Sequence, residues 1–214
     1  MSCGLPAPGP SENFTLETIT RRQAPVWYHV FCTRDHPNTP ESFSLGWGDT
    51  RFAPLKLPDG RPVGTWYAAT SERAACLESV LHDVPLDPPG VFSLADLAHY
   101  RIAALKLDDA IQCVSFHTPF LPKLHLTRGQ LIDSEAACYA ETRAWAQASF
   151  DQRPSAQGIV WGSRRDDSAR CLMLFQQRFR GSPIREVLHE TPLASPPQRE
   201  QFVDLALRLG IHLI

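Results

Sequence analysis

The chain has 214 residues, which suits one domain with long loops. Hydrophobic residues make up 43% and charged residues 21%, the composition of an ordinary globular protein with a sizeable core. A formal net charge of −2 argues against nucleic-acid binding as the main function, and no apolar run approaches the roughly 20 residues of a membrane span.

The first half of the chain alternates irregular segments with short ordered ones. Residues 1–12 are expected to form a flexible tail, followed by a single domain over 13–214, and TLETITRRQ (15–23) predicts a short helix. VWYHVF (26–31) and GTWYAA (64–69) are rich in aromatic and β-branched residues and predict strands. The stretch 33–62 between them is irregular, and a loop of this length inside a domain is usually functional or disordered. SERAACLESVLHD (71–83) predicts a helix beginning near Ser71.

The second half contains further strands and two helices. RIAALKL (101–107), IQCVSF (111–116), GIVWGS (158–163) and ARCLMLF (169–175) predict strands. Residues 134–150 predict a helix with Ser134 as its N-cap, and residues 196–209 an amphipathic C-terminal helix. Because strands and helices mix without a regular βαβ alternation, the prediction is an α+β fold.

Cysteines and histidines give no sign of a metal site. The six cysteines include no CxxC pair, and the eight histidines include no HxH or HExxH pattern. We therefore expect reduced thiols and no metal. The N-terminal sequence lacks the basic start and apolar stretch of a secretory signal, so we expect a cytoplasmic protein.

Glu78 occupies an unusual position on the predicted helix 71–83. At ~100° per residue it falls beside Ala74 and Leu81, at the edge of the apolar face, and away from Ser79 and Asp83. A carboxylate is almost never fully buried without a partner. Glu78 therefore either forms a structural ion pair with an arginine or is a carboxylate held against a substrate cation.

Other polar residues adjoin apolar segments, and each has a structural alternative. Arg51 in DTRFAPL suits a phosphate or carboxylate but fits a surface loop equally well. Tyr67 could stack on a flat ring or pack in the core. Ser163 and Arg164 follow a buried strand and meet either a ligand or a capped turn, while His29 in WYHVF is a ligand contact or a core histidine. Dinucleotide-fold, phosphate-loop and GxSxG hydrolase motifs are missing or incomplete.

The order of these segments resembles the RES-domain family, which is named for an Arg, a Glu and a Ser. RFAPL, YAATSERAACLESVLHD and IVWGSRRDDSARCLMLF carry the resemblance, which extends over about residues 26–180. Arg51 corresponds to the family's arginine in a GRF-x-P segment, Glu78 to its glutamate and Ser163 to its serine. Tyr67 matches the strand tyrosine that precedes the glutamate helix.

The resemblance implies an NAD-consuming toxin of a bacterial toxin–antitoxin pair, with a fold similar to that of ADP-ribosyltransferase toxins. Glu78 would bind the ribose hydroxyls or stabilise the oxocarbenium-like state that forms when the nicotinamide–ribose bond breaks. Arg51 and Arg164 would contact the pyrophosphate, Tyr67 would stack on nicotinamide, and Ser163 would orient the nicotinamide ribose or amide. The expected partners are NAD, inorganic phosphate and an antitoxin.

One departure from the family pattern leaves alternatives open. Many members carry an arginine in an early Tyr-Arg pair, whereas this chain has Tyr28–His29 and so lacks that phosphate contact. The resemblance therefore implies an NAD phosphorylase or glycohydrolase, or an ADP-ribosyltransferase acting on a protein, and the departure leaves open a non-catalytic domain that binds a nucleotide or partner. The C-terminal helix could support a homodimer, dock an antitoxin or pack on its own domain.

Overall fold

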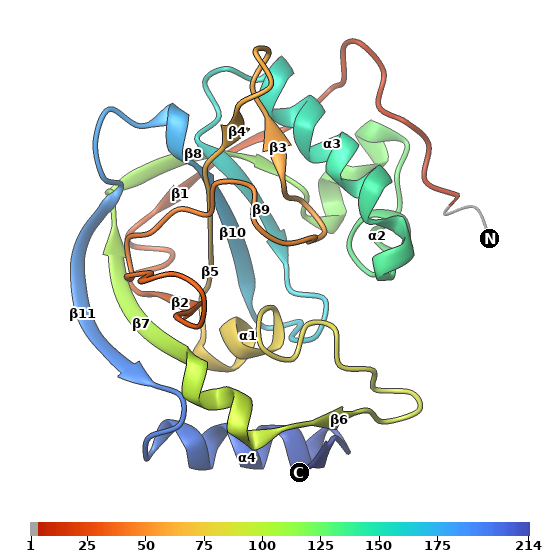
Figure 1. Ribbon diagram of the computed structural model, residues 1–214. Helices are drawn as coiled ribbons and strands as arrows, with labels where there is room; N and C mark the ends of the chain where they lie inside the picture. The colour runs from red at the N-terminus through yellow and green to blue at the C-terminus, as the bar shows by residue number, and fades with distance from the viewer. Residues whose placement is uncertain (1–3) are drawn as a thin grey trace.

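The computed structural model describes residues 4–214 and contains an eight-stranded, strongly curled sheet in the order β1-β8-β9-β10-β5-β2-β7-β11 (Figure 1). Its strands are β1 (Leu16–Thr20), β2 (Trp27–Cys32), β5 (Thr65–Ala69), β7 (Tyr100–Leu107), β8 (Ala110–Ser115), β9 (Gly158–Gly162), β10 (Arg170–Phe175) and β11 (Ile184–Pro192). β8 and β9 pair in parallel, and the other neighbours pair antiparallel. The mixture of helices with a mostly antiparallel sheet confirms the predicted α+β class.

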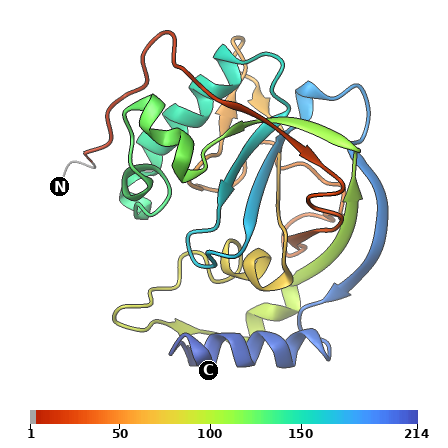
Figure 2. The same cartoon turned by 180° about the vertical axis from the view of Figure 1, so that it is seen from behind.

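The helices gather at two ends of the sheet (Figures 1 and 2). At one end lie α2 (Arg128–Leu131) and α3 (Tyr139–Gln152), and at the other lie α1 (Glu72–Leu77) and α4 (Gln198–Arg208). The shorter elements are β3 (Leu55–Lys56), β4 (Pro62–Val63), β6 (Val91–Phe92), β12 (His212–Leu213), and the 3-10 helices η1 (Leu94–His99), η2 (Thr118–Leu124), η3 (Ala136–Cys138) and η4 (Gln176–Arg178).

Each face of the sheet covers its own apolar core, because side chains alternate along a strand. In β2, Trp27 and Phe31 enter one core, whereas Tyr28 and Val30 pack against the other. The second of these cores also contains Trp145 of α3 and receives most of the buried helix residues. This alternation decides which residues of the central strands can face the helices.

The sheet is incompletely closed between β2 and β5. β2 forms six register pairs with β7 but a single one with β5, between Tyr28 and Ala69. The loop 33–54 crosses this gap, and its Ser44 forms a two-bond bridge to Thr65 of β5. The predicted irregular stretch is therefore confirmed, since it contains only the two-residue strand β3 and the start of β4 among residues 33–62.

α1 is much shorter than the predicted helix 71–83. Ser71 is its N-cap, as predicted, and accepts the Ala74 N–H at 3.1 Å. The helix ends at Leu77, and the chain then forms turns in which the Leu81 N–H bonds back to the Cys76 carbonyl at 3.0 Å. Arg165 donates to the Leu81 carbonyl, so this turn is fixed from outside the helix.

Two further predictions were wrong at the level of elements. TLETITRRQ forms the edge strand β1, because Leu16–Thr20 pairs with β8 over five residues and buries Ile19. Ser134 is not the N-cap of the long helix, which begins at Tyr139; instead its hydroxyl accepts a hydrogen bond from Arg51. In both segments a long-range contact overrides the local pattern.

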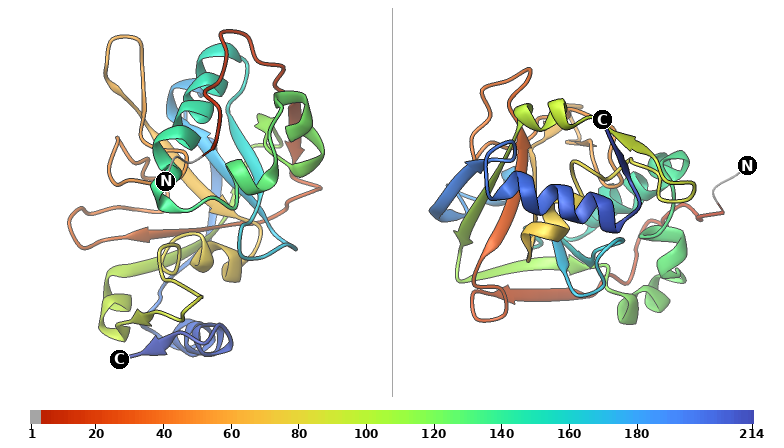
Figure 3. Two further views of the ribbon diagram at one scale, coloured as in Figure 1. Left: turned by 90° about the vertical axis from the view of Figure 1, so that its right-hand side faces the viewer. Right: turned by 90° about the horizontal axis from the view of Figure 1, so that it is seen from below.

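The C-terminal helix is confirmed as α4, and it packs on its own chain (Figure 3). Phe202 and Ala206 are buried, and the Phe202 ring lies 5.2 Å from that of Phe92. Within residues 4–214, no helix is long and apolar enough to cross a membrane.

The N-terminal segment and one cysteine differ from the expectations drawn from the sequence. Residues 1–3 of the predicted tail lie outside the described part; residues 4–12 form no helix or strand, but Leu5 is buried and the Pro6 carbonyl accepts the Trp145 indole N–H at 2.8 Å. Four cysteines are free thiols, namely Cys32, Cys76, Cys113 and Cys171. Cys138 corrects the expectation of reduced thiols, because it is disulfide-bonded.

Candidate active site

A cavity of about 450 Å³ lies along the gap between β2 and β5. Consecutive residues of both strands line it, together with the loop 33–54 and the segment that follows α1. Its polar and aromatic lining includes Tyr28, His29, His36, Trp47, Thr50, Arg51, Tyr67, Glu78, His82, Asp83 and Trp161. Four of the residues predicted from the sequence, Arg51, Tyr67, Glu78 and His29, therefore meet at one cavity.

Glu78 is half-buried at the cavity wall, immediately after α1. Ser163 donates its hydroxyl to Glu78 Oε1 at 2.6 Å, and the Arg164 backbone N–H donates to the same oxygen at 2.8 Å. The carboxylate is therefore held from the loop after β9 through one oxygen, without an arginine side chain among its hydrogen-bond donors in residues 4–214. A structural Glu–Arg pair, the alternative drawn from the sequence, does not describe this arrangement.

Ser163 is fully buried, and its hydroxyl is saturated. Besides donating to Glu78, Oγ accepts the backbone N–H groups of Arg165 at 3.2 Å and Asp166 at 3.1 Å. A serine hydroxyl has one donor and two acceptor positions, and all three are used here. Ser163 is also not part of the cavity lining, so its hydroxyl contacts Glu78 and not the cavity.

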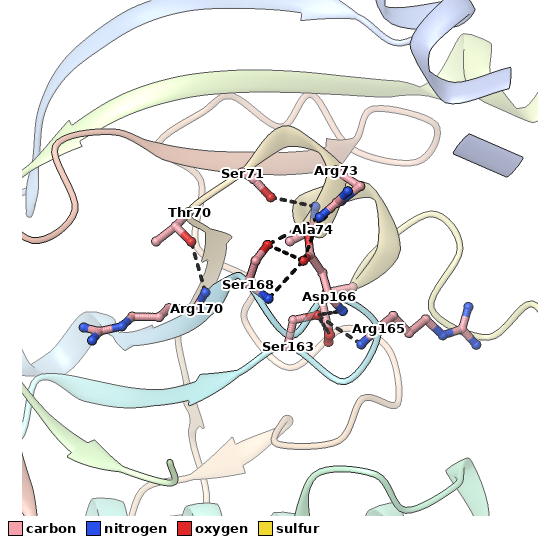
Figure 4. Close-up of polar contacts among 10 residues, drawn as sticks. Thr70, Ser71, Arg73, Ala74, Ser163, Arg165, Asp166, Ser168 and Arg170 are labelled. Carbon is pink, nitrogen blue, oxygen red and sulfur yellow. Dashed lines mark hydrogen bonds and ion pairs between the residues drawn. The ribbon is translucent and has the colours of Figure 1, made fainter. Parts of the chain in front are cut away.

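The loop after β9 is fastened to α1 by ionic and backbone contacts (Figure 4). Arg73 of α1 binds Asp166 through two parallel hydrogen bonds of 2.8 and 2.9 Å. Hydrogen bonding from Arg73 lowers the pKa of the Asp166 carboxyl group. Arg165 donates to the carbonyls of Leu81 and Val84, in the segment that follows α1. The Glu78 and Ser163 segments therefore form one unit.

Arg51 is a buried cation with an unused donor. The residue is 4% exposed, and Nη1 donates to the backbone carbonyl of Ser134 at 2.9 Å and to its hydroxyl at 2.8 Å. Nη2 is buried and has no hydrogen-bond partner among residues 4–214. Burial lowers the pKa of Arg51, and the positive charge of nearby Arg164 acts in the same direction.

No ion pair in the described part of the chain includes Arg51 or Arg164. Two arginines near Glu78 thus lack an anionic partner, and a buried arginine without one is costly unless a ligand supplies the counter-charge. Arg164 differs from Arg51 in its placement, because its backbone binds Glu78 and its side chain is not part of the cavity lining.

Tyr67 is the half-buried residue in the middle of an otherwise buried strand β5. Its hydroxyl lies 3.0 Å from Thr50 Oγ1, and its ring meets that of Trp161 edge to face at 6.2 Å. Burial raises the pKa of the Tyr67 hydroxyl, so it stays neutral at physiological pH. These contacts fix the orientation of a ring that faces the cavity.

His29 spans the gap between β2 and β5. Its Nδ1 lies 2.6 Å from the Tyr67 carbonyl, and its ring packs against Trp66 and Phe31. Burial lowers its pKa to about 4, so the ring is neutral at pH 7. With Nδ1 donating to the carbonyl, Nε2 is an acceptor, and it has no partner in the described part of the chain. A neutral ring cannot replace the missing family arginine as a phosphate ligand.

Tyr139 supports two residues of the cavity lining, Arg51 and His82, without lining the cavity itself. Its ring lies under Arg51, whose Cζ is 5.4 Å from the ring centroid. Its hydroxyl is 2.9 Å from His82 Nε2, and burial lowers the pKa of His82. His82 lies four residues after Glu78, a spacing that could have suggested a shared face, but Tyr139 is distant in sequence and gave no local signal.

The site offers a fixed carboxylate, two arginines without anionic partners, a neutral histidine acceptor and aromatic rings. Residues 4–214 contain no group of three or more His, Cys, Asp or Glu side chains that could hold a metal ion. A carboxylate can stabilise a developing positive charge, and the arginines can bind an anionic group of the same ligand. A molecule that combines a planar ring, phosphates and a cationic centre would match all of these features.

Comparison with known proteins identifies the family. No curated protein matches the chain at the threshold applied. The family model of the RES domain matches residues 26–195, which is most of the chain and includes every site residue described above. The chain therefore belongs to the RES domain family.

Proposed function

We propose that this protein cleaves the bond between nicotinamide and ribose in NAD. The observation that carries the proposal is the Glu78 carboxylate, held at the cavity wall by Ser163 and the Arg164 backbone through a single oxygen. Both hydrogen bonds end on Oε1, so Oε2 remains for the substrate. Membership of the RES domain family supports the choice of NAD.

Charge development during the reaction explains the role of Glu78. As the glycosidic C–N bond breaks, nicotinamide leaves as a neutral molecule with the bonding electron pair, and positive charge grows on the ribose. A carboxylate fixed beside this charge stabilises the transition state more than the ground state, which is what accelerates the reaction. Water then adds to C1″ and releases a proton, giving ADP-ribose, or phosphate adds to the same carbon to give ADP-ribose 1″-phosphate.

Substrate binding would use the remaining side chains. Arg51, with its unpartnered Nη2, would bind one pyrophosphate oxygen, and Arg164 would add a second cation nearby. Tyr67 would stack on the nicotinamide ring, and His29 Nε2 would accept a hydrogen bond from an N–H group of the substrate. Holding the substrate in a reactive geometry can contribute several kcal/mol to lowering the barrier.

Product analysis tests this proposal. Purified protein is incubated with NAD in phosphate and in phosphate-free buffer, and nicotinamide, ADP-ribose and ADP-ribose 1″-phosphate are quantified. Cleavage in both buffers to ADP-ribose indicates hydrolysis, and a phosphate-dependent product indicates phosphorolysis. Label transferred from NAD to a macromolecule would instead indicate ADP-ribosyl transfer. Absence of nicotinamide release under all conditions refutes the proposal.

We also propose that the chain is the toxin of a toxin–antitoxin pair, because that pairing is typical of its family. The antitoxin would then neutralise the enzyme in a stable complex. Co-expression with the product of the adjacent gene, followed by co-purification and measurement of nicotinamide release, tests this. A neighbouring protein that neither binds nor inhibits contradicts it.

A further inference from the structure

Trp47 is an exposed aromatic residue at the mouth of the catalytic cavity. The residue is 60% exposed, and it lines the same cavity as Glu78 and Arg51. The other exposed large hydrophobic residues of the described chain do not line this cavity; they are Leu16, Leu45, Val91, Val187, Leu188, Leu207 and Ile214. A single exposed apolar residue needs no explanation by itself. Whether Trp47 contacts a ligand is therefore judged from its position at the cavity and from the contacts that hold its ring.

The indole is supported as a platform. The His36 ring, which also lines the cavity, lies against it with a centroid distance of 4.4 Å and an interplanar angle of 42°. Trp47 stands between Gly46, with φ of +96°, and Gly48, with φ of +82°. A side chain at Gly46 would also approach the Cβ of Pro62 to 3.3 Å. Residues with side chains rarely adopt these positive φ values, so the two glycines allow a tight turn of the backbone on either side of Trp47. This turn presents the indole outward.

The chain also limits the distance between this platform and the buried cation. Trp47 precedes Arg51 by four residues, which span at most roughly 14 Å even when fully extended. An aromatic surface and a phosphate-binding arginine within this range suit a nucleotide, whose base and phosphates are separated by one ribose. Indole faces bind bases of any sequence, because every base has a π-face.

We propose that Trp47, supported by His36, stacks on the adenine ring of the substrate and forms the adenylate subsite of the cavity. The inference rests on the proposed NAD-cleaving function for its biological meaning, but the binding it describes does not require turnover. It assigns the two rings of NAD to different walls, with nicotinamide near Tyr67 and Glu78 and adenine on Trp47. Recognition of the adenine half then distinguishes NAD from smaller nicotinamide compounds.

The test uses two probes that each carry half of the dinucleotide. ADP-ribose contains adenine and both phosphates but no nicotinamide, and nicotinamide mononucleotide contains the scissile bond but no adenine. Binding of each to the full chain is measured by calorimetry for wild type, Trp47→Ala and Trp47→Phe. Leu45→Ala is the matched control, because Leu45 is 51% exposed on the same loop but does not line the cavity.

Trp47→Ala is expected to weaken ADP-ribose binding about 5- to 150-fold, with nicotinamide mononucleotide binding changed less than about twofold. Trp47→Phe retains most of the affinity, and Leu45→Ala binds both probes like wild type. The inference is overturned if Trp47→Ala binds ADP-ribose like wild type, if it loses nicotinamide mononucleotide instead, if it weakens both probes equally, or if wild type binds no ADP-ribose.

Failure of the two proposals can be told apart. If wild type releases no nicotinamide from NAD but Trp47→Ala still weakens ADP-ribose binding selectively, the proposed activity is wrong and the adenine subsite stands. If NAD is cleaved and ADP-ribose binding does not depend on Trp47, the activity stands and the subsite lies elsewhere. Because the side chain is mostly exposed, the variant is expected to fold, and its thermal midpoint checks this.

Discussion

Substitution of Ser163 by alanine tests whether this residue acts through Glu78 or on the substrate. The change removes three hydrogen bonds, one to the Glu78 carboxylate and two from the backbone N–H groups of Arg165 and Asp166. A hydrogen bond to a charged group contributes about 1.5–3 kcal/mol, and each unpaired buried N–H costs about 1–3 kcal/mol. Allowing for water at the looser site, we expect the free energy of unfolding to fall by about 2–4 kcal/mol.

The kinetic effect of Ser163→Ala should fall on kcat. Without the hydroxyl, the Glu78 carboxylate keeps only the Arg164 backbone contact, so its position beside the ribose is less defined. Loss of about 1.5–3 kcal/mol of transition-state stabilisation reduces kcat about 10- to 150-fold. KM for NAD should change less than about threefold, because Ser163 does not line the cavity.

The predicted fall in kcat is checked by measuring nicotinamide release, and the predicted loss of stability by urea unfolding. Both are measured well below the thermal midpoint. Ser168→Ala is the matched control, because Ser168 binds Asp166 in the same loop but makes no contact with Glu78. Its kcat should stay within about twofold of wild type. A Ser163→Ala enzyme with normal kcat and a raised KM would show that Ser163 binds the substrate directly and would refute the positioning argument. Equal losses in the two variants would indicate general loosening of the loop.

Three further substitutions probe the other walls of the cavity. Arg51→Lys keeps the charge but loses the planar fork, so calorimetry should show NAD binding weakened about 10- to 150-fold, and unchanged affinity would contradict a phosphate contact. Tyr67→Phe keeps the ring and should leave KM for NAD within about threefold, whereas Tyr67→Ala should raise it about 5- to 150-fold; similar losses in both would assign the effect to the hydroxyl. Burial lowers the pKa of His29 to about 4 in the folded protein, whereas an unfolded histidine titrates near 6.5. Between these two pH values the unfolded state binds more protons than the folded state. The free energy of unfolding therefore falls as the pH is lowered through this window. Urea unfolding of wild type should show about 3 kcal/mol of loss from this group between pH 7.5 and pH 4, which His29→Asn should lack, and an identical pH dependence in both proteins would contradict the assignment.

Local sequence patterns predicted the elements that depend on local physics. The strands 26–31 and 64–69 follow from their β-branched and aromatic residues, and Ser71 has the chemistry of a helix cap. Contacts distant in sequence decided the failures. α1 ends early because Arg165 binds the backbone carbonyls of Leu81 and Val84, which follow it. Ser134 does not cap a helix, because its hydroxyl accepts a hydrogen bond from Arg51.

The same distinction explains what the sequence could tell about the site. Ordered family motifs were enough to bring Arg51, Tyr67 and Glu78 together as candidates, and all three line one cavity. The saturation of the Ser163 hydroxyl could not be predicted, since it depends on three partners fixed only by folding. Trp47 gave no signal either, because its platform depends on the course of a long loop.

Glu78→Gln provides the most direct test of the central claim that Glu78 stabilises the cation formed from NAD. Glutamine keeps an oxygen that can accept the hydrogen bonds of Ser163 and the Arg164 backbone, so the site retains its shape while the negative charge is removed. The measurement is single-turnover release of nicotinamide from saturating NAD, with the NAD dissociation constant determined in parallel. The account predicts a rate at least about 100-fold below wild type, with an affinity changed less than about threefold. Release at the wild-type rate by the Gln variant would contradict it.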